Sequence, residues 1–123
     1  MTVGADIERV SRGAAAGIGY LRRAGHGEVP PLVLLHGIGS NEQSFVPLID
    51  ALPPTLDRIA WTAPGYGSSQ ALKAIAPTPH DYADALLKFL DALKLSRVVL
   101  LGHSLGCLFA ASFAAAHPER IAA

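Results

Sequence analysis

A serine between two glycines is the residue of this sequence best suited to nucleophilic chemistry. Gly102-His103-Ser104-Leu105-Gly106 fits the pattern G-x-S-x-G. An apolar run at 98–101 precedes it, and a mostly apolar, small-residue stretch follows from Cys107. A strand that turns sharply into a helix would lift the Ser104 hydroxyl clear of a sheet and aim the first free N–H groups of the helix at the same point. This is the layout of a nucleophile elbow.

The pattern alone leaves an alternative open, because serine with glycine is also ordinary loop chemistry and three fixed positions arise often by chance. The strand-like run before it and the helix-like run after it favour the elbow. A serine in the uncommon backbone conformation of such a turn needs small residues two positions away on either side, which Gly102 and Gly106 supply. For Cys107, one turn into the helix, the favoured interpretation is core packing and not a second nucleophile.

A second glycine-bearing loop, His36-Gly37-Ile38-Gly39-Ser40, follows the apolar run 32–35. The run does not alternate with polar residues, which is typical of a strand covered on both faces in a parallel sheet. Backbone N–H groups in such a loop are able to face a developing negative charge. By itself, the loop is better explained as an ordinary turn into a short helix, which we expect to begin with Ser44 as its N-cap and to end at Leu52.

The remaining pattern supplies the elements that must position these loops. Thr78, Pro79 and Asp81 predict a capping box that opens an amphipathic helix to Lys94. The helix after Ser104 has almost no polar side chain, so we expect it to be covered nearly all round. The sequence also predicts a strand over 56–61, a tight loop over 63–69, and an N-terminal hairpin whose strands 7–10 and 18–22 flank a loop over 13–17.

Composition excludes several classes of function. The chain has 123 residues, half of them apolar, and a formal net charge of zero, which suits one small globular domain and disfavours binding to nucleic acid or an anionic membrane. The N-terminus has no leader pattern and no window is apolar enough to span a bilayer, so we expect a cytoplasmic protein. Gly65-Tyr66-Gly67 lacks the lysine of a phosphate-binding loop, which disfavours a nucleotide site.

Four motifs, taken together and in order, resemble the N-terminal half of an α/β-hydrolase. They are Leu34-Leu35-His36-Gly37-Ile38-Gly39, Ala63-Pro64-Gly65-Tyr66-Gly67-Ser68, Gly102-His103-Ser104-Leu105-Gly106 and His117-Pro118-Glu119-Arg120-Ile121. The resemblance implies an α/β fold with a mostly parallel sheet flanked by helices. It also implies that residues 1–123 are the N-terminal portion of a single domain, truncated before the last strands and the lid. No cofactor and no metal are expected.

By this resemblance Ser104 is the catalytic nucleophile of a serine hydrolase acting on a small acyl substrate. The backbone N–H of Leu105, with that of Ile38 or Gly39, would form the oxyanion hole. The residues that support the two motifs are His36, Gly37, Gly102, His103 and Gly106. A serine here disfavours the haloalkane dehalogenase and epoxide hydrolase branches, which carry aspartate, and leaves esters, thioesters, lactones or activated carbon–carbon bonds as substrates.

The sequence departs from the family at Thr62, where aspartate is usual. The Thr62 hydroxyl is still able to bond backbone groups, so the departure bears on the rigidity of the loop more than on the chemistry.

A second departure concerns the catalytic acid and histidine, which in this family follow later strands. The five histidines of the chain are His26, His36, His80, His103 and His117. None is expected to act as the base, and His117 ends the helix that starts at Ser104, far from the hydroxyl. We therefore expect the isolated chain to be nearly inactive and poorly stable, a fragment or one piece of a split protein. Its partner would be a complementary C-terminal segment or chain. The alternative is a non-catalytic hydrolase-like binding module.

Overall fold

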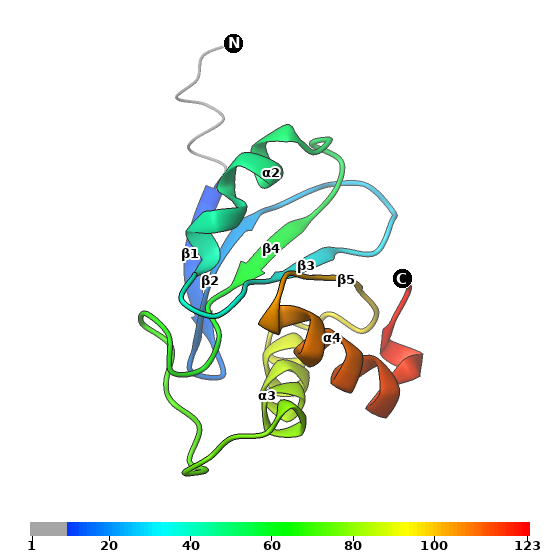
Figure 1. Cartoon of the computed structure of the whole chain (residues 1–123). Helices are drawn as coiled ribbons and strands as arrows, with labels where there is room; N and C mark the ends of the chain where they lie inside the picture. The colour runs from blue at the N-terminus through cyan, green and yellow to red at the C-terminus, as the bar shows by residue number, and fades with distance from the viewer. Residues whose placement is uncertain (1–9) are drawn as a thin grey trace.

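The computed structural model in Figure 1 describes residues 10–123 and contains one five-stranded sheet in the order β1-β2-β4-β3-β5. The strands are β1 (Val10–Ala15), β2 (Ile18–Arg23), β3 (Leu32–Leu35), β4 (Arg58–Trp61) and β5 (Val99–Gly102). The helices are η1 (Glu42–Phe45), α2 (Val46–Ala51), α3 (Pro79–Ala92), α4 (Leu105–Ala116) and η2 (Pro118–Arg120), where η marks a 3-10 helix. The expected α/β fold is confirmed.

The centre of the sheet is parallel, as the unbroken apolar runs predicted. β3 pairs in parallel with both β4 and β5, and every residue of β3 and β4 is buried. β2 runs antiparallel to β4 and to β1, so the N-terminal hairpin forms an antiparallel margin. The carboxyl ends of the parallel strands, where ligands bind in open α/β sheets, therefore lie together at one edge.

The N-terminal hairpin differs from the prediction in its first strand. Positions 7–9 lie outside the described residues, and β1 runs through Ala15, over most of the stretch that was expected to be the loop. The connection is only Ala16 and Gly17, with φ angles of 52° and 77°. Two consecutive positive φ angles suit the twist of a two-residue hairpin. Hydrogen bonding to β2 thus outweighs the weak strand propensity of alanine and glycine here.

Helices cover the two faces of the sheet unequally (Figure 1). Alternate strand residues, including Val33, Ile59 and Trp61, pack in one core with Phe89 of α3 and Phe109 of α4. The opposite face forms a smaller core, whose buried residues are Leu32, Leu34, Phe45, Ile49 and Ala60. α3 and α4 therefore back the sheet on one side, and η1 and α2 on the other.

The two predicted helix starts have different outcomes. At α3 the capping box is confirmed: the Thr78 hydroxyl accepts from Asp81 N, and the Asp81 carboxylate accepts from Thr78 N. At the earlier helix the predicted N-cap is wrong. Asn41 caps η1 by accepting from the Gln43 N–H, whereas Ser44 lies inside η1 and donates its hydroxyl to the Asn41 carbonyl.

α4 is less covered than its composition predicted. Only Gly106, Phe109 and Phe113 are buried in it, while Leu108 is 53 % exposed. Cys107 is exposed as well, so its assignment to the core is wrong for the described residues, and its thiol donates to the Gly102 carbonyl at 3.1 Å. The helix is apolar all round, but the described residues pack against one side of it.

β5 forms the margin of the sheet next to α4. Beyond it, the described chain supplies only the start of a parallel pairing, a bridge between Val98 and Ile121. The N–H of Ala122 donates to Val98 O at 2.8 Å, and that of Leu100 donates to Ala123 O at 3.0 Å. The C-terminus accordingly lies beside β5 in Figure 1.

Within residues 10–123, none of the helices combines the length and the apolar character that crossing a bilayer requires.

Candidate active site

Ser104 stands at the corner between β5 and α4, exposed at the surface and acting as the N-cap of the helix. Its backbone angles are φ 56° and ψ −119°, a conformation that L-residues rarely adopt. The helix starts at once, with Cys107 N donating to the Ser104 carbonyl at 2.9 Å. The serine hydroxyl and the N–H of Leu105, the first residue of α4, therefore lie at the same corner of the molecule.

The glycines around Ser104 are required by close packing. A Cβ on Gly102 would lie 2.5 Å from the carbonyl oxygen of Gly106, and one on Gly106 would collide with the carbonyl oxygen of Leu35. On the neighbouring loop, a Cβ on Gly37 would lie 2.9 Å from the Cβ of Ser104. These contacts are made by main chain or by Cβ, which cannot rotate away. The elbow and the end of β3 with its loop are thus in direct contact at two side-chain-free positions, Gly106 and Gly37.

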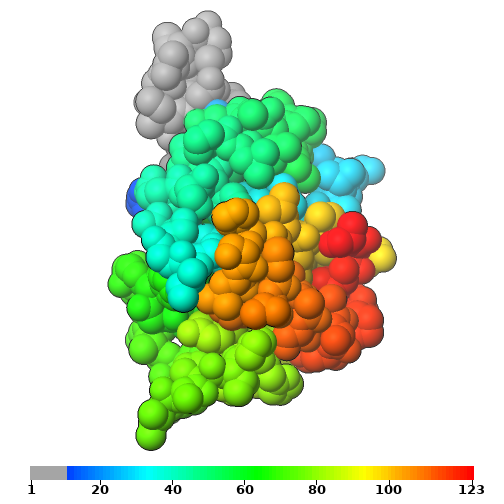
Figure 2. Space-filling view, in the orientation of Figure 1, coloured from blue at the N-terminus to red at the C-terminus, as the bar shows by residue number. Residues whose placement is uncertain are grey.

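The loop after β3 brings the expected oxyanion donors to the elbow. β3 pairs with β5 up to Leu35 and Gly102, and the His103 N–H then donates to Leu35 O at 3.0 Å. Ile38 and Gly39 follow directly on Gly37, and both are exposed. Figure 2 shows the orange start of α4 at the surface beside the cyan segment that follows β3. The structure therefore places the three predicted donor residues in two adjoining segments.

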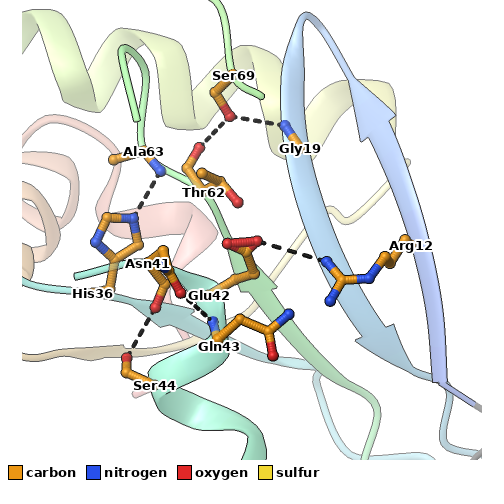
Figure 3. Close-up of polar contacts among 10 residues, drawn as sticks. All are labelled: Arg12, Gly19, His36, Asn41, Glu42, Gln43, Ser44, Thr62, Ala63 and Ser69. Atoms are coloured by element: carbon orange, nitrogen blue, oxygen red, sulfur yellow. Dashed lines mark hydrogen bonds and ion pairs between the residues drawn. The ribbon is translucent and has the colours of Figure 1, made fainter. Parts of the chain in front are cut away.

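His36 holds this loop in place through both ring nitrogens, and Figure 3 shows its hydrogen bond with Ala63. Its ring is buried, Nε2 accepts from the N–H of Ala63 at 3.0 Å, and Nδ1 lies 2.9 Å from the Gly37 carbonyl. Because an amide N–H can only donate, Nε2 carries the lone pair and the proton is on Nδ1. His36 is therefore a positioning residue that joins the loop after β3 to the loop after β4, and neither ring nitrogen is free to act as a base.

The loop after β4 is fixed by Ser69, a residue that the sequence analysis did not single out. The Ser69 hydroxyl donates to Thr62 O at 2.5 Å and accepts from Gly19 N at 2.9 Å. The Thr62 hydroxyl was expected to bond backbone groups; that expectation is wrong, because its buried oxygen has no hydrogen-bond partner among the described residues. Nothing in the local sequence distinguished Ser69 from its neighbour Ser68 as the residue that makes these bonds.

The other histidines do not complete a nucleophile–base pair. His103 is exposed next to Ser104, and His26 lies in the loop between β2 and β3. His80 and His117 face carboxylates at 3.6 and 3.7 Å, on α3 and beyond the far end of α4. Within residues 10–123 no histidine ring is hydrogen-bonded to the Ser104 hydroxyl, and no three metal-binding side chains cluster.

Aromatic rings support α4 from behind the elbow. Tyr82 of α3 stacks on Phe109 with ring centroids 4.3 Å apart, and Trp61 of β4 meets the same ring edge-on at 6.2 Å. Burial raises the pKa of Tyr82 above its usual value, with a smaller contribution from the nearby Tyr66. Tyr82 therefore stays neutral at physiological pH, and the start of α4 rests on a rigid, uncharged layer.

This fold and geometry agree with the comparisons to known proteins. Residues 30–123 match the family model described as alpha/beta hydrolase fold. The chain belongs to the α/β-hydrolase family.

Among curated members of the α/β-hydrolase family, two relatives show how far the similarity extends. One is the (E)-2-((N-methylformamido)methylene)succinate hydrolase of Acinetobacter baylyi, 34 % identical over 77 % of this chain and 36 % of that protein. The other is the poly(3-hydroxyalkanoate) depolymerase of Ectopseudomonas oleovorans, 36 % identical over 80 % of this chain and 34 % of that protein. The chain thus spans about a third of the length of these relatives.

Among solved α/β-hydrolase structures, a membrane phospholipase A described as a bacterial virulence factor is similar to this chain. The TM-score is 0.83 at 28 % sequence identity, covering 94 % of this chain and 39 % of the phospholipase. Nearly the whole chain therefore superposes on about two fifths of the phospholipase chain.

Proposed function

We propose that this chain carries the nucleophile and the oxyanion-binding groups of a serine hydrolase that acts on a carboxylic ester or a related acyl compound. The observation that carries the proposal is Ser104 at φ 56°, exposed at the N-terminus of α4 and in contact with the glycine loop after β3. A conformation this unfavourable persists where the surrounding structure enforces it, which is common at active sites. The family relationship supports the same interpretation.

In the proposed reaction, the Ser104 oxygen attacks the substrate carbonyl carbon and its proton passes to a general base. The carbonyl oxygen becomes an oxyanion that accepts hydrogen bonds from the N–H of Leu105 and that of Ile38 or Gly39. Collapse of this intermediate breaks the bond to the leaving alcohol, which takes the proton, and leaves an acyl group on Ser104. Water then attacks the acyl-enzyme and releases the acid and the free serine.

The base and its acid partner are proposed to come from polypeptide other than these 123 residues. Two observations support this: no histidine is bonded to Ser104 in the described part of the chain, and the matched segment covers only about a third of each curated relative. Loss of the histidine from a serine protease reduces its rate on the order of a million-fold. We therefore propose that the isolated chain is nearly inactive and that a complementary segment restores activity.

An active-site label tests this proposal. A fluorophosphonate probe is added to the isolated chain and to a chimaera in which residues 1–123 are followed by the matching C-terminal part of the Acinetobacter baylyi relative. Intact mass and peptide mapping then report the adduct. We expect slow labelling of the isolated chain, fast labelling of the chimaera on Ser104, and none with Ser104→Ala.

Each other outcome has a definite meaning. Labelling of the chimaera that survives Ser104→Ala would contradict Ser104 as the nucleophile. Rapid labelling of Ser104 in the isolated chain would contradict the need for a further segment. A folded chimaera that is never labelled would favour the non-catalytic binding module.

The place of action is also a proposal. A formal net charge of zero, with no excess of basic residues, suits the cytoplasm. Cell fractionation with an antibody against the chain tests this, and recovery in the membrane fraction would contradict it.

A further inference from the structure

The Ser69 hydroxyl takes part in a continuous series of hydrogen bonds that leads from β2 to the loop after β3. It accepts from Gly19 N at 2.9 Å and donates to the Thr62 carbonyl at 2.5 Å. The Thr62 carbonyl and the Ala63 N–H belong to the same peptide group, and that N–H donates to Nε2 of His36 at 3.0 Å. Figure 3 shows these bonds joining β2, the loop after β4 and His36.

The series continues from His36 to the peptide group that carries one of the candidate oxyanion donors. Because Nε2 accepts a hydrogen bond, the ring proton is on Nδ1, which lies 2.9 Å from the Gly37 carbonyl. That carbonyl shares its planar peptide group with the N–H of Ile38. Within residues 10–123 the Ile38 N–H has no acceptor of its own, so it is available to a bound oxyanion.

All the hydrogen bonds of this series run in the same direction. The serine hydroxyl, the first peptide group, the imidazole and the second peptide group each accept on the side of Gly19 and donate on the side of Ile38. A group that accepts a hydrogen bond becomes a better donor, so each bond strengthens the next, by about 10–30 %. The polarisation therefore accumulates at the Ile38 N–H.

The surroundings of the series preserve its geometry. Ser69, Thr62, Ala63 and His36 are all buried, so water does not compete for these bonds and the low dielectric strengthens them. Turn bonds from Tyr66 N to Ala63 O and from Ser69 N to Tyr66 O, each 2.9 Å long, fix the main chain of the serine. The Ser69 hydroxyl is thus held at the carbonyl of the same peptide group that binds His36.

We propose that Ser69 is a positioning residue for the oxyanion hole. Through this series it orients the Gly37–Ile38 peptide group and strengthens the Ile38 N–H as a donor to the oxyanion. Ser69 is buried and acts on the reaction only through His36. The catalytic part of this inference rests on the proposed function, whereas the series of hydrogen bonds does not.

Ser68 provides a matched control in the same loop. It is exposed, precedes Ser69 directly in the sequence, and makes none of the bonds of the series. Ser69→Ala removes the hydroxyl that both accepts and donates, and Ser69→Thr retains a hydroxyl there. Ser68→Ala removes a hydroxyl that lies outside the series.

NMR of the isotopically labelled 123-residue chain tests the series without a catalytic readout. In the parent chain we expect a scalar coupling across the hydrogen bond between Ala63 N and Nε2 of His36. Loss of a hydrogen bond at a carbonyl moves the amide nitrogen resonance of the next residue upfield. Ser69→Ala should therefore move the resonances of Ala63 and Ile38, Ser68→Ala should leave that of Ile38 in place, and Ser69→Thr should retain the parent values.

The catalytic consequence is measured on the chimaera with the Acinetobacter baylyi relative. Ser69→Ala should slow fluorophosphonate labelling of Ser104 by about 3–10-fold, less than the roughly hundredfold loss on removing an oxyanion donor outright. The effect is smaller because the Ile38 N–H remains and is only weakened and less well oriented. Ser68→Ala and Ser69→Thr should be labelled at close to the parent rate.

Three results would overturn the inference. One is the absence of a coupling between Ala63 and His36, which needs no substitution and so decides the matter even where Ser69→Ala fails to fold. Another is an Ile38 resonance that Ser69→Ala moves no more than Ser68→Ala does. The third is equal labelling of these two variants in the chimaera. If the resonances move as expected but the chimaera is never labelled, the series of hydrogen bonds stands and the proposed function fails.

Discussion

Glycine is required for different reasons in the elbow and in the loop after β3: at one position a side chain lacks space, and at the other the backbone conformation is unfavourable. Gly106 has an ordinary φ, but a Cβ there would collide with the main-chain oxygen of Leu35. Gly39 has φ +71° and no atom within 4 Å of where its Cβ would lie. One position therefore excludes a side chain for lack of space, and the other only strains it.

Alanine at these two glycines should have unequal effects. We expect Gly106→Ala to reduce the free energy of unfolding by about 3 kcal/mol, because the elbow must open to admit the methyl group. Gly39→Ala should reduce it by about 1 kcal/mol, the strain of a left-handed residue. Urea unfolding of both variants checks this, and equal losses would contradict the packing explanation.

For single residues, the spacing of the motifs identified those whose role depends only on near neighbours in the sequence. Gly102 and Gly106 could be predicted because a strained turn requires small neighbours at fixed distances in the sequence. The contacts of Ser69 and Glu42 could not, because each is made with a strand far away in the sequence. Only the register of the hairpin against β4 brings Gly19 and Thr62 together.

Among the helices, α3 has a start that local sequence explains fully. Its cap, its first proline and its acidic third residue all act within one turn, so no tertiary contact was needed to foresee them. η1 was misjudged because Asn41 and Ser44 are both good caps by type. The choice between them depends on how the chain leaves the loop after β3. The end of β1 was predicted as a loop because pairing with β2, and not the composition of residues 13–15, makes this segment a strand.

Removing the cap should weaken α3 by a measurable amount. Thr78→Ala abolishes the hydroxyl that accepts from Asp81 N, and we expect a loss of about 1 kcal/mol in the free energy of unfolding. Thr78→Ser keeps the oxygen and should lose only a few tenths of that. Urea unfolding followed by circular dichroism measures both, and an equal loss from the two substitutions would argue against capping as the cause.

On the scale of the whole molecule, both elements at the end of the described fold, β5 and α4, expose a large apolar side chain. Leu101 is 37 % exposed and Leu108 is 53 % exposed, beside a strand whose outer edge is paired only at its start. The sequence predicted the parallel sheet and its helices, and it predicted that α4 needs cover nearly all round. An apolar helix indicates that a cover is needed without showing which residues provide it.

The isolated chain should therefore self-associate through this surface. We expect light scattering to show concentration-dependent oligomers, because exposed strand edges and apolar patches pair readily. Leu108→Glu should shift the population toward the monomer. Ile75→Glu is the matched control, since Ile75 is fully exposed in the loop before α3, away from this surface. Equal effects of the two substitutions would mean that general solubility, and not this surface, governs association.

The backbone conformation of Ser104 implies that stability and function favour different residues at this position. A side chain at φ 56° and ψ −119° is strained by about 1–3 kcal/mol, and glycine at that position is not. Ser104→Gly should therefore unfold at higher urea concentration than the parent chain, whereas Ser104→Ala, which keeps the Cβ, should not. A midpoint for Ser104→Gly at or below that of Ser104→Ala would contradict this. If it holds, selection for stability alone would replace the serine, and its presence marks a position kept for what it does to other molecules.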